Sequence, residues 1–149
     1  TRDFTATTFV VRDRKTLLLW HNKIQAWLPP GGHIDPDELP DVAARREVEE
    51  ESGLEVELVT TGAAAGPLGK VERLHTPVCI LLEDIEPGHQ HIDLIYFART
   101  TDDRPARVNE REAAQHRWCT WEELAAPDIE EDIRVLGRQA IDAVSGSAS

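Results

Sequence analysis

The sequence predicts a mixed α/β sandwich in which strands surround one central helix. Segments with strand-like patterns outnumber helical segments, and they flank a run of good helix formers at residues 40–52. A chain of 149 residues with 40% hydrophobic side chains has the size of one domain and can bury one compact core. No internal repeat or linker divides it, so we expect residues 1–149 to fold as a single domain.

Strands are expected where β-branched or alternating apolar residues lie between turn residues. A polar turn at 12–15 should join the first two strands, and Glu86-Pro87-Gly88 should join two interior strands. Residues 27–32 contain two prolines and two glycines, so they should not form regular structure for long. Residues 62–70 are expected to form a Gly/Ala loop. The expected strands are 5–11, 16–21, 54–61, 78–83, 91–99 and, shorter, 115–120.

The central helix carries start and stop signals. Pro40 suits the first helical position, and Gly53 suits the left-handed residue just past the end. Leu39 falls on the N-cap, where it should cost about 1 kcal/mol relative to Ser or Asp. Further helical segments are expected at 121–126 and 128–144, followed by a frayed tail at 145–149.

The charge balance excludes several classes of partner. Asp and Glu number 28 against 16 Lys and Arg, which gives a net charge of −12. A protein that binds extended nucleic acid or an anionic membrane needs a basic surface, and this chain has the opposite. Its longest apolar runs are far shorter than the ~20 residues that span a bilayer. A phosphate-bearing substrate would therefore need a divalent cation to bring it in.

The cysteines indicate the compartment. Cys79 and Cys119 lie far apart in the sequence and lack the Cys-x-x-Cys spacing of a zinc or redox site. We expect them to be reduced, buried thiols of a cytoplasmic protein.

Acidic side chains crowd the end of the central helix. Glu47, Glu50 and Glu51 fall within an arc of about 100°, while Glu49 points away. Carboxylates near a helix C-terminus are disfavoured by roughly 0.3–1 kcal/mol each. Two interpretations follow from the cluster alone. It is either a solvated face paired with the neighbouring arginines, or a site for a hard cation such as Mg²⁺ or Mn²⁺.

The spacing of these acids favours the cation site. Gly32, five residues, Glu38, seven residues and then REVEEESGL at 46–54 match G-x5-E-x7-R-E-U-x-E-E-x-G-U, where U is aliphatic. This is the Nudix box, and the sequence resembles the Nudix hydrolase family over residues 32–54. Chance would produce such a match about once in 10⁹ start positions. The flanking segments WLPPGG and WCTWEEL resemble the approach to the box and the closing motif of the family.

The resemblance implies a Nudix-type α/β/α sandwich with a mixed central sheet. It also implies Mg²⁺- or Mn²⁺-dependent hydrolysis of a nucleoside diphosphate linked to another moiety, X, by attack of water on phosphorus. It places Glu50 and Glu51 as metal ligands, with the carbonyl oxygen of Gly32 as another. Glu47 is in the position that ligates metal or orients the water. Arg46 resembles the partner that holds the acids in place through charge-assisted hydrogen bonds.

Candidate residues outside the box keep alternative interpretations. Some family members take another acid, as ligand or general base, from a loop before the final strand. Glu112 matches that position, with Glu110 as a fallback, unless it is a solvated loop acid. His91 and Asp93 share one strand face; they either meet the substrate or metal site or form a hydrogen-bonded pair within the sheet.

Two further residues flank the loop that precedes the box. His33 either approaches a phosphate or lies on a surface loop, and Trp27 either stacks on a base or packs against the protein. The moiety X is less defined, because the Pro or Tyr that marks some family subgroups is absent near 69–71. A nucleoside triphosphate or its oxidised form is therefore the default substrate.

The same residues are compatible with other functions. A non-hydrolytic binding or regulatory module on the Nudix fold is one, although such relatives usually lose box acids and none is lost here. A diphosphate isomerase is a more remote one. Many family members dimerise, which makes a homodimer one expected state of this chain.

Overall fold

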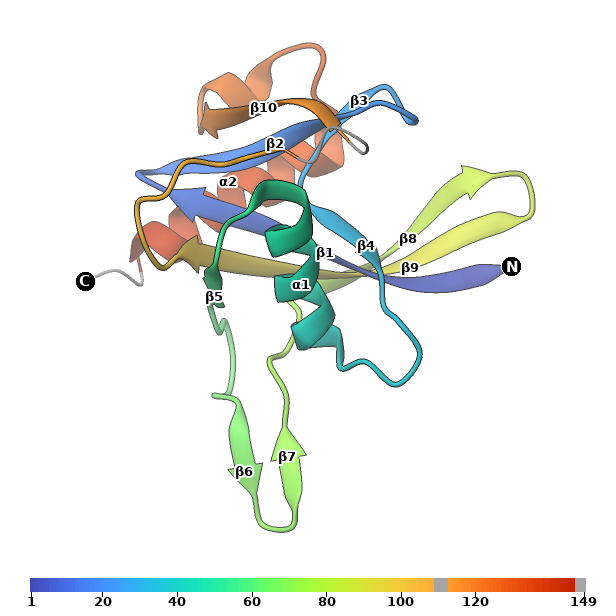
Figure 1. Cartoon of the computed structure of the whole chain (residues 1–149), viewed down its shortest axis with the longest axis vertical. Helices are drawn as coiled ribbons and strands as arrows, with labels where there is room; N and C mark the ends of the chain where they lie inside the picture. Colours follow the sequence, from blue (N-terminus) through green and yellow to red (C-terminus); the bar gives the residue numbers. More distant parts are fainter. Residues whose placement is uncertain (109–112, 147–149) are drawn as a thin grey trace.

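The computed structural model describes residues 1–108 and 113–146 of the chain. Within this part, strands form one mixed sheet in the order β10-β2-β1-β9-β5, with β3 on β2, β4 on β1 and β8 on β9. Helix α1 lies on the near side of the sheet and α2 behind it (Figure 1). The mixed α/β sandwich that the sequence predicts is therefore confirmed.

The elements have the following bounds. The long strands are β1 Arg2–Arg12, β2 Lys15–His21, β8 Cys79–Glu86, β9 His89–Thr100 and β10 Ala113–Thr120. The short strands are β3 Ala26–Leu28, β4 Gly31–His33, β5 Val56–Leu58, β6 Gly66–Leu68 and β7 Val71–Arg73. The helices are α1 Pro40–Ser52, a 3₁₀ turn η1 Glu123–Ala125 and α2 Glu131–Gly146.

Strand β1 runs through the middle of the molecule and packs on both sides. Its side chains alternate in direction, so successive residues enter different cores. Ala6 and Val10 belong to the core beneath α1, whereas Phe9 and Val11 belong to the core beneath α2. Strand β9 runs parallel to β1 over most of its length, which places the start of β9 beside the start of β1.

Helix α1 begins and ends where the sequence predicts. Leu39 at the N-cap makes no side-chain capping hydrogen bond. Gly53 has φ of 70°, and its N–H donates to the Glu49 carbonyl at 2.8 Å. Ala43, Ala44 and Val48 bury one stripe of the helix against the sheet. The acidic end of α1 is thereby fixed beside β4.

The segment before the box is more regular than its composition suggests. Strands β3 and β4 pair with β2 and β1, and Pro29 and Pro30 separate them. The loop expected at 62–70 is partly wrong, because β6 and β7 form a two-stranded hairpin around Gly69, whose φ is 61°. A left-handed glycine is compatible with a tight hairpin turn as well as with a loop.

Other boundaries differ from those expected, and β1, β8, β9 and β10 extend beyond the predicted ranges. The strand expected at 54–61 is limited to β5, and the helix expected at 121–126 is the single turn η1. Helix α2 runs to Gly146, so the first two residues of the expected tail are helical. The expected single domain at 1–149 stays a prediction.

The cysteines lie on separate strands as free thiols. Cys119 on β10 is buried and Cys79 on β8 is partly buried. Burial raises the pKa of both thiols, which disfavours the reactive thiolate. These features agree with the expected reduced thiols.

Candidate active site

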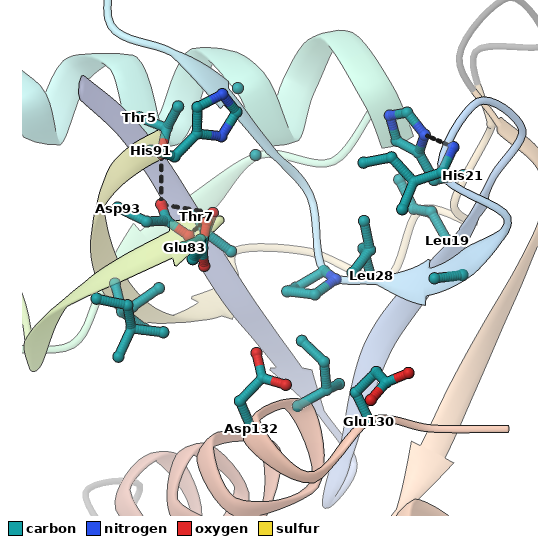
Figure 2. A pocket seen from close by; sticks show the side chains of 18 of the residues that line it. Thr5, Thr7, Leu19, His21, Leu28, Glu83, His91, Asp93, Glu130 and Asp132 are labelled. Carbon is teal, nitrogen blue, oxygen red and sulfur yellow. Dashed lines mark hydrogen bonds between the residues drawn. The ribbon is translucent and has the colours of Figure 1, made fainter. Parts of the chain in front are cut away.

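A cleft of ≈ 560 Å³ opens between β4, the end of α1, the β8–β9 hairpin and the start of α2. Figure 2 shows side chains that line it, among them Thr5 of β1, Glu83 of β8, Asp93 of β9 and Asp132 of α2. Several residues singled out from the sequence line this one cleft: Gly32, His33, Glu51, His91 and Asp93. The fold therefore brings together residues that are as far apart in the chain as Gly32 and Asp93.

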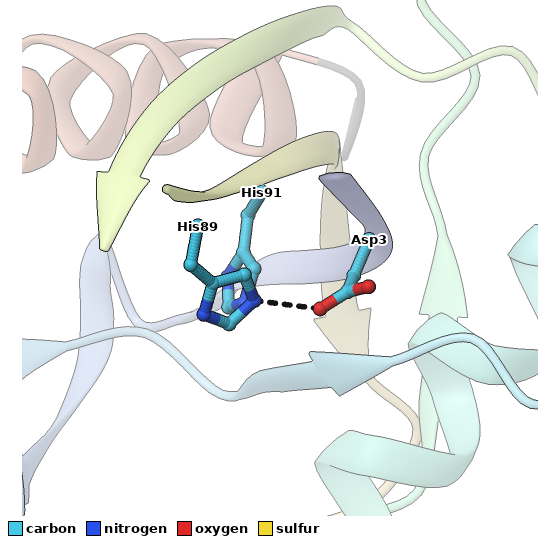
Figure 3. A group of neighbouring side chains, drawn as sticks. All are labelled: Asp3, His89 and His91. Atoms are coloured by element: carbon cyan, nitrogen blue, oxygen red, sulfur yellow. Dashed lines mark hydrogen bonds and ion pairs between the residues drawn. The ribbon is translucent and has the colours of Figure 1, made fainter. Parts of the chain in front are cut away.

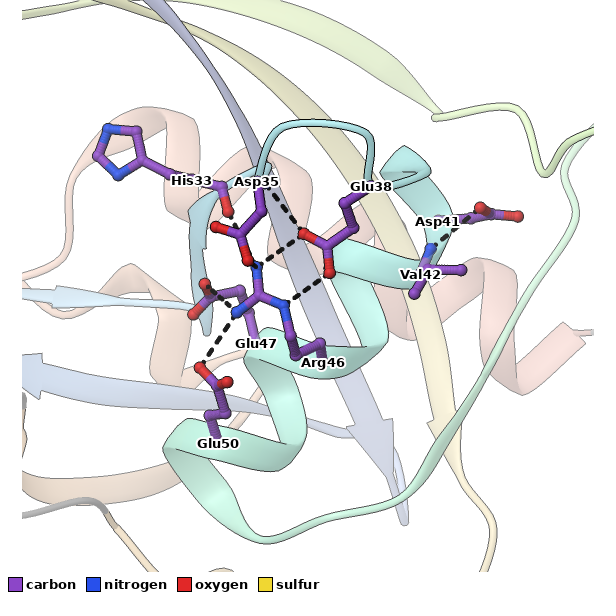
Figure 4. A network of polar contacts seen from close by, with 8 residues as sticks. All are labelled: His33, Asp35, Glu38, Asp41, Val42, Arg46, Glu47 and Glu50. Carbon is purple, nitrogen blue, oxygen red and sulfur yellow. Dashed lines mark hydrogen bonds and ion pairs between the residues drawn. The ribbon is translucent and has the colours of Figure 1, made fainter.

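The Arg46 guanidinium connects the acids next to this cleft (Figure 4). Its Nε and Nη2 donate to the two carboxylate oxygens of Glu38 at 2.7 and 2.9 Å. Its Nη1 donates to Glu47 at 2.9 Å and to Glu50 at 3.1 Å. Nη2 also donates to the carbonyl oxygen of His33 at 3.0 Å. One side chain thus fixes α1 relative to β4 and to the turn between them.

The acids of the box differ in exposure. Glu47 and Glu51 are buried, at 8% and 9% exposed, whereas the Glu50 side chain is 54% exposed. Burial raises the pKa of Glu47, and hydrogen bonds with Glu51 and Arg46 oppose this shift. The hydrogen bond from Arg46 is the main cause of the lowered pKa of Glu38.

The charges at this point do not balance within the cluster. Arg46 carries one positive charge against the four carboxyl groups of the box. A buried carboxylate close to others is costly unless a cation compensates it. The salt-bridged face considered from the sequence accounts for Glu50 and for the contact of Glu47 with Arg46. The burial of Glu47 and Glu51 sets these two acids apart from a solvated face.

Gly32 is required for the approach of β4 to the acids. A Cβ atom built on Gly32 would lie 2.6 Å from the Glu47 carboxylate. The strand backbone therefore packs directly on this carboxylate, in register with Ala6 of β1. Gly32 at the start of the motif and Glu47 next to Arg46 are therefore in direct contact.

Asp93 and His91 line the wall formed by β9. Asp93 is 4% exposed and accepts hydrogen bonds from Thr5 at 2.9 Å and Thr7 at 2.8 Å. These hydroxyl groups of β1 take the place of the His91–Asp93 pair considered from the sequence. The rings of His91 and His33 meet edge to face, with centroids 5.2 Å apart.

Four predicted site residues that the structure describes do not line the cleft itself: Trp27, Arg46, Glu47 and Glu50. Trp27 packs edge to face on Trp20 at 5.4 Å, lies 5.2 Å from the Arg117 guanidinium, and donates its indole N–H to Asp128 at 3.2 Å. Its role in stacking on a base stays a prediction. Glu112 and its fallback Glu110 lie outside the described residues.

Sequence reasoning missed Glu83 of β8 and Asp132 of α2, which also line the cleft. Burial, with the nearby charge of Asp93, raises the pKa of Glu83 to about 8. The strand expected at 78–83 was the available signal, since residues two apart in a strand, such as Leu81 and Glu83, share a face. It could not reveal that β8 pairs with β9 in the register that sets Leu81 opposite Asp93.

The chain is similar to known proteins over most of its length. The family model of the NUDIX domain matches residues 2–139. The chain belongs to the Nudix family. A NUDIX-family hydrolase from Clostridium perfringens is 34% identical, with 97% of this chain and 99% of that chain covered and a TM-score of 0.83. The Nudix assignment makes this chain a hydrolase acting on phosphoanhydride bonds.

More distant structures share the Nudix fold. A MutT NUDIX hydrolase from Burkholderia pseudomallei is 22% identical, with 97% and 98% of the two chains covered and a TM-score of 0.69. An Ap4A hydrolase from C. elegans is 19% identical, with 97% and 96% covered and a TM-score of 0.69. At these identities the likeness shows the fold alone. Among curated protein sequences, none matches the chain.

Proposed function

We propose that this Nudix hydrolase is a Mg²⁺- or Mn²⁺-dependent pyrophosphohydrolase. Its substrate would be a nucleoside diphosphate linked to X, with a nucleoside triphosphate or its oxidised form as the default. The observation that carries the proposal is the buried pair Glu47 and Glu51: Glu51 lines the ≈ 560 Å³ cleft, and Glu47 packs against Gly32, which also lines it. Carboxylate oxygens with excess negative charge fit a hard divalent cation.

The residues would divide the work as follows. Glu50, Glu51 and the Gly32 carbonyl oxygen would hold the cation, and Glu47 would ligate it or orient the attacking water. When bound, the cation would neutralise the pyrophosphate and lower the pKa of a bound water. Arg46 would position the acids, because it donates hydrogen bonds to Glu47 and Glu50 but does not itself line the cleft.

The outer residues would act on the substrate. His33, His91 and Asp93 line the cleft, so they are placed to contact phosphates or X. Glu112 would supply a further ligand or the general base, and Trp27 would contact the base. These roles follow the family resemblance and await mutation.

The partners of the chain are small molecules in this proposal. The chain has a net charge of −12, which disfavours an extended nucleic acid or an anionic membrane as a partner. No helix in residues 1–108 and 113–146 is long and apolar enough to span a membrane. We also propose a cytoplasmic location and a homodimer; sedimentation measurements would test the dimer.

A matched pair of glutamine variants tests the function. Glu51→Gln should lower turnover of a nucleotide panel with Mg²⁺ by about 100-fold or more, because even outer groups around a metal typically account for 10–100-fold. Glu49→Gln is the control, since Glu49 lies on the same helix but its side chain is exposed. It should retain wild-type turnover.

Two outcomes would contradict the proposal. Undiminished turnover by Glu51→Gln would remove the metal mechanism. Metal-dependent binding of nucleotides without any product, across a broad panel, would instead favour the non-hydrolytic binding module. Conversion of isopentenyl diphosphate would favour the isomerase.

A further inference from the structure

Three histidines and one aspartate gather on one face of the sheet. Asp3 lies near the start of β1, His89 and His91 begin β9, and His33 ends β4. The strand register explains the cluster. Asp3 pairs with His91 across the parallel β1–β9 ladder, and Thr5, two residues further along β1, pairs with His33. Residues two apart in a strand share a face.

From this cluster we infer a second metal site, for a transition-metal ion of the Zn²⁺ class. Asp3, His89 and His91 would be its ligands, and His33 would complete the set. Figure 3 shows the first three side chains converging from two strands. This site is separate from the Mg²⁺ or Mn²⁺ site proposed above, and it does not depend on that proposal.

The distances fit a site that closes by small side-chain rotations. One ligand atom from each of Asp3, His89 and His91 lies within 4.8 Å of the others. His89 Nε2 is 2.6 Å and His33 Nε2 is 3.6 Å from Asp3 Oδ2. Ligands of tetrahedral Zn²⁺ at ~2.1 Å stand about 3.4 Å apart. The atoms would therefore move by about 1 Å.

The chemistry of the donors separates this site from the acidic one. Imidazole nitrogen suits Zn²⁺, Cu²⁺ and Ni²⁺, whereas Mg²⁺ prefers oxygen ligands. A site with three imidazole nitrogens and one carboxylate oxygen therefore favours a transition-metal ion over Mg²⁺. The acids of α1 offer oxygen ligands alone. The net charge of −12 favours cation binding at either place.

A second observation concerns His91. Its Nε2 is buried and has no hydrogen-bond partner within the described part of the chain. A buried polar atom without a partner is costly, and native proteins rarely leave one. The rings of His33 and His89 approach that of His91, with centroids 5.2 and 5.1 Å away. A metal ion held among these rings would supply the missing interaction.

The location gives the site a functional position. His33 and His91 also line the cleft, so an ion bound here would lie at its rim. The side chains of Asp3 and His89 are 41% and 25% exposed, which leaves a path for the ion from solvent.

The test measures metal content and does not depend on turnover. The chain is stripped with a chelator, loaded with Zn²⁺ in a large excess of Mg²⁺, desalted, and analysed for zinc by mass spectrometry. We expect about one Zn²⁺ per chain in the wild type and in Glu51→Gln. Asp3→Asn and His89→Ala should weaken Zn²⁺ binding by more than about tenfold, because even outer-shell groups cost that much.

Controls keep the test decisive. His116→Ala removes an exposed histidine of β10 and should leave Zn²⁺ binding unchanged. Asp3 and His89 are partly exposed, so these variants should fold, and circular dichroism checks this. Three results would overturn the site: no retained Zn²⁺ in the wild type, full retention in the Asp3→Asn, His89→Ala double variant, or loss in Glu51→Gln.

Discussion

At the scale of single residues, the position of Glu47 depends on the missing side chain of Gly32 as well as on the hydrogen bond from Arg46. The Glu47 carboxylate occupies the space that a Cβ on Gly32 would need. Arg46 donates to that carboxylate at 2.9 Å and fixes it from the other side. Gly32 and Arg46 therefore determine where Glu47 lies, although neither carries the negative charge.

Gly32→Ala tests this steric role. The added methyl should displace the Glu47 side chain, so we expect turnover and Mg²⁺ affinity to fall by about 10–100-fold. The loss of stability should be small, because the end of a side chain moves and not the backbone. Turnover, Mg²⁺ titration and thermal unfolding measure the three quantities.

The neighbouring glycine provides the contrast. A Cβ on Gly31 would lie 2.9 Å from the Ala6 carbonyl oxygen, which is backbone in the middle of the sheet. Gly31→Ala should therefore destabilise the fold strongly. Gly62 meets open space, so Gly62→Ala should change neither property. If Gly32→Ala kept normal turnover, the close contact between Gly32 and Glu47 would not be needed for activity.

At the scale of elements, the β8–β9 pairing creates a carboxyl pair that local sequence could not reveal. Glu83 on β8 comes close to Asp93 on β9, and burial together with this charge raises the pKa of Glu83 to about 8. In the unfolded chain Glu83 ionises at a much lower pH. The folded state therefore loses stability as the pH rises toward 8, because ionisation is easier when the chain unfolds.

Glu83→Gln should remove this pH dependence. Near pH 4 the variant and the wild type should unfold at about the same temperature, since Glu83 is then mostly protonated in both the folded and the unfolded wild type. The variant should become progressively more stable than the wild type up to about pH 8. Glu72→Gln, an exposed change on β7, serves as control. A difference that stays flat or shrinks with rising pH would contradict the expected pairing.

The elements differ in how far sequence alone defined them. Helix α1 was predicted to the residue because Pro40 and Gly53 act locally at its two ends. The β6–β7 hairpin was missed because glycines and alanines at 62–70 are typical of loops as well as of tight turns. Strand β5 was overextended because β-branched residues continue past Leu58, where the register with β9 ends.

At the scale of the whole molecule, the box residues were found from the sequence because their spacing is fixed along one helix and one loop. Asp3, His89, Glu83 and Asp132 were not found, since strand pairing and helix packing bring them to the site. His91 and Asp93 lie between these cases. Alternation placed them on one face, but only the parallel register with β1 shows that Thr5 and Thr7 bind Asp93.

The net charge of −12 also acts on the whole molecule, and it makes cation binding measurable as stability. Any salt screens the repulsion among exposed acids, because the Debye length falls to about 10 Å at 0.1 M ionic strength. A specific site adds to this effect. At 100 times the dissociation constant, bound Mg²⁺ should add about 2.7 kcal/mol to the free energy of unfolding.

We therefore expect Mg²⁺ to raise the unfolding temperature by about 5–10 °C above NaCl of equal ionic strength. Glu49→Gln should keep this difference and Glu51→Gln should lose most of it, although both remove one negative charge from α1. General screening would affect the two variants alike, whereas a cation held by Glu51 distinguishes them. If Mg²⁺ and NaCl stabilised the wild type equally, the crowded carboxylates would be a screened surface and not a binding site.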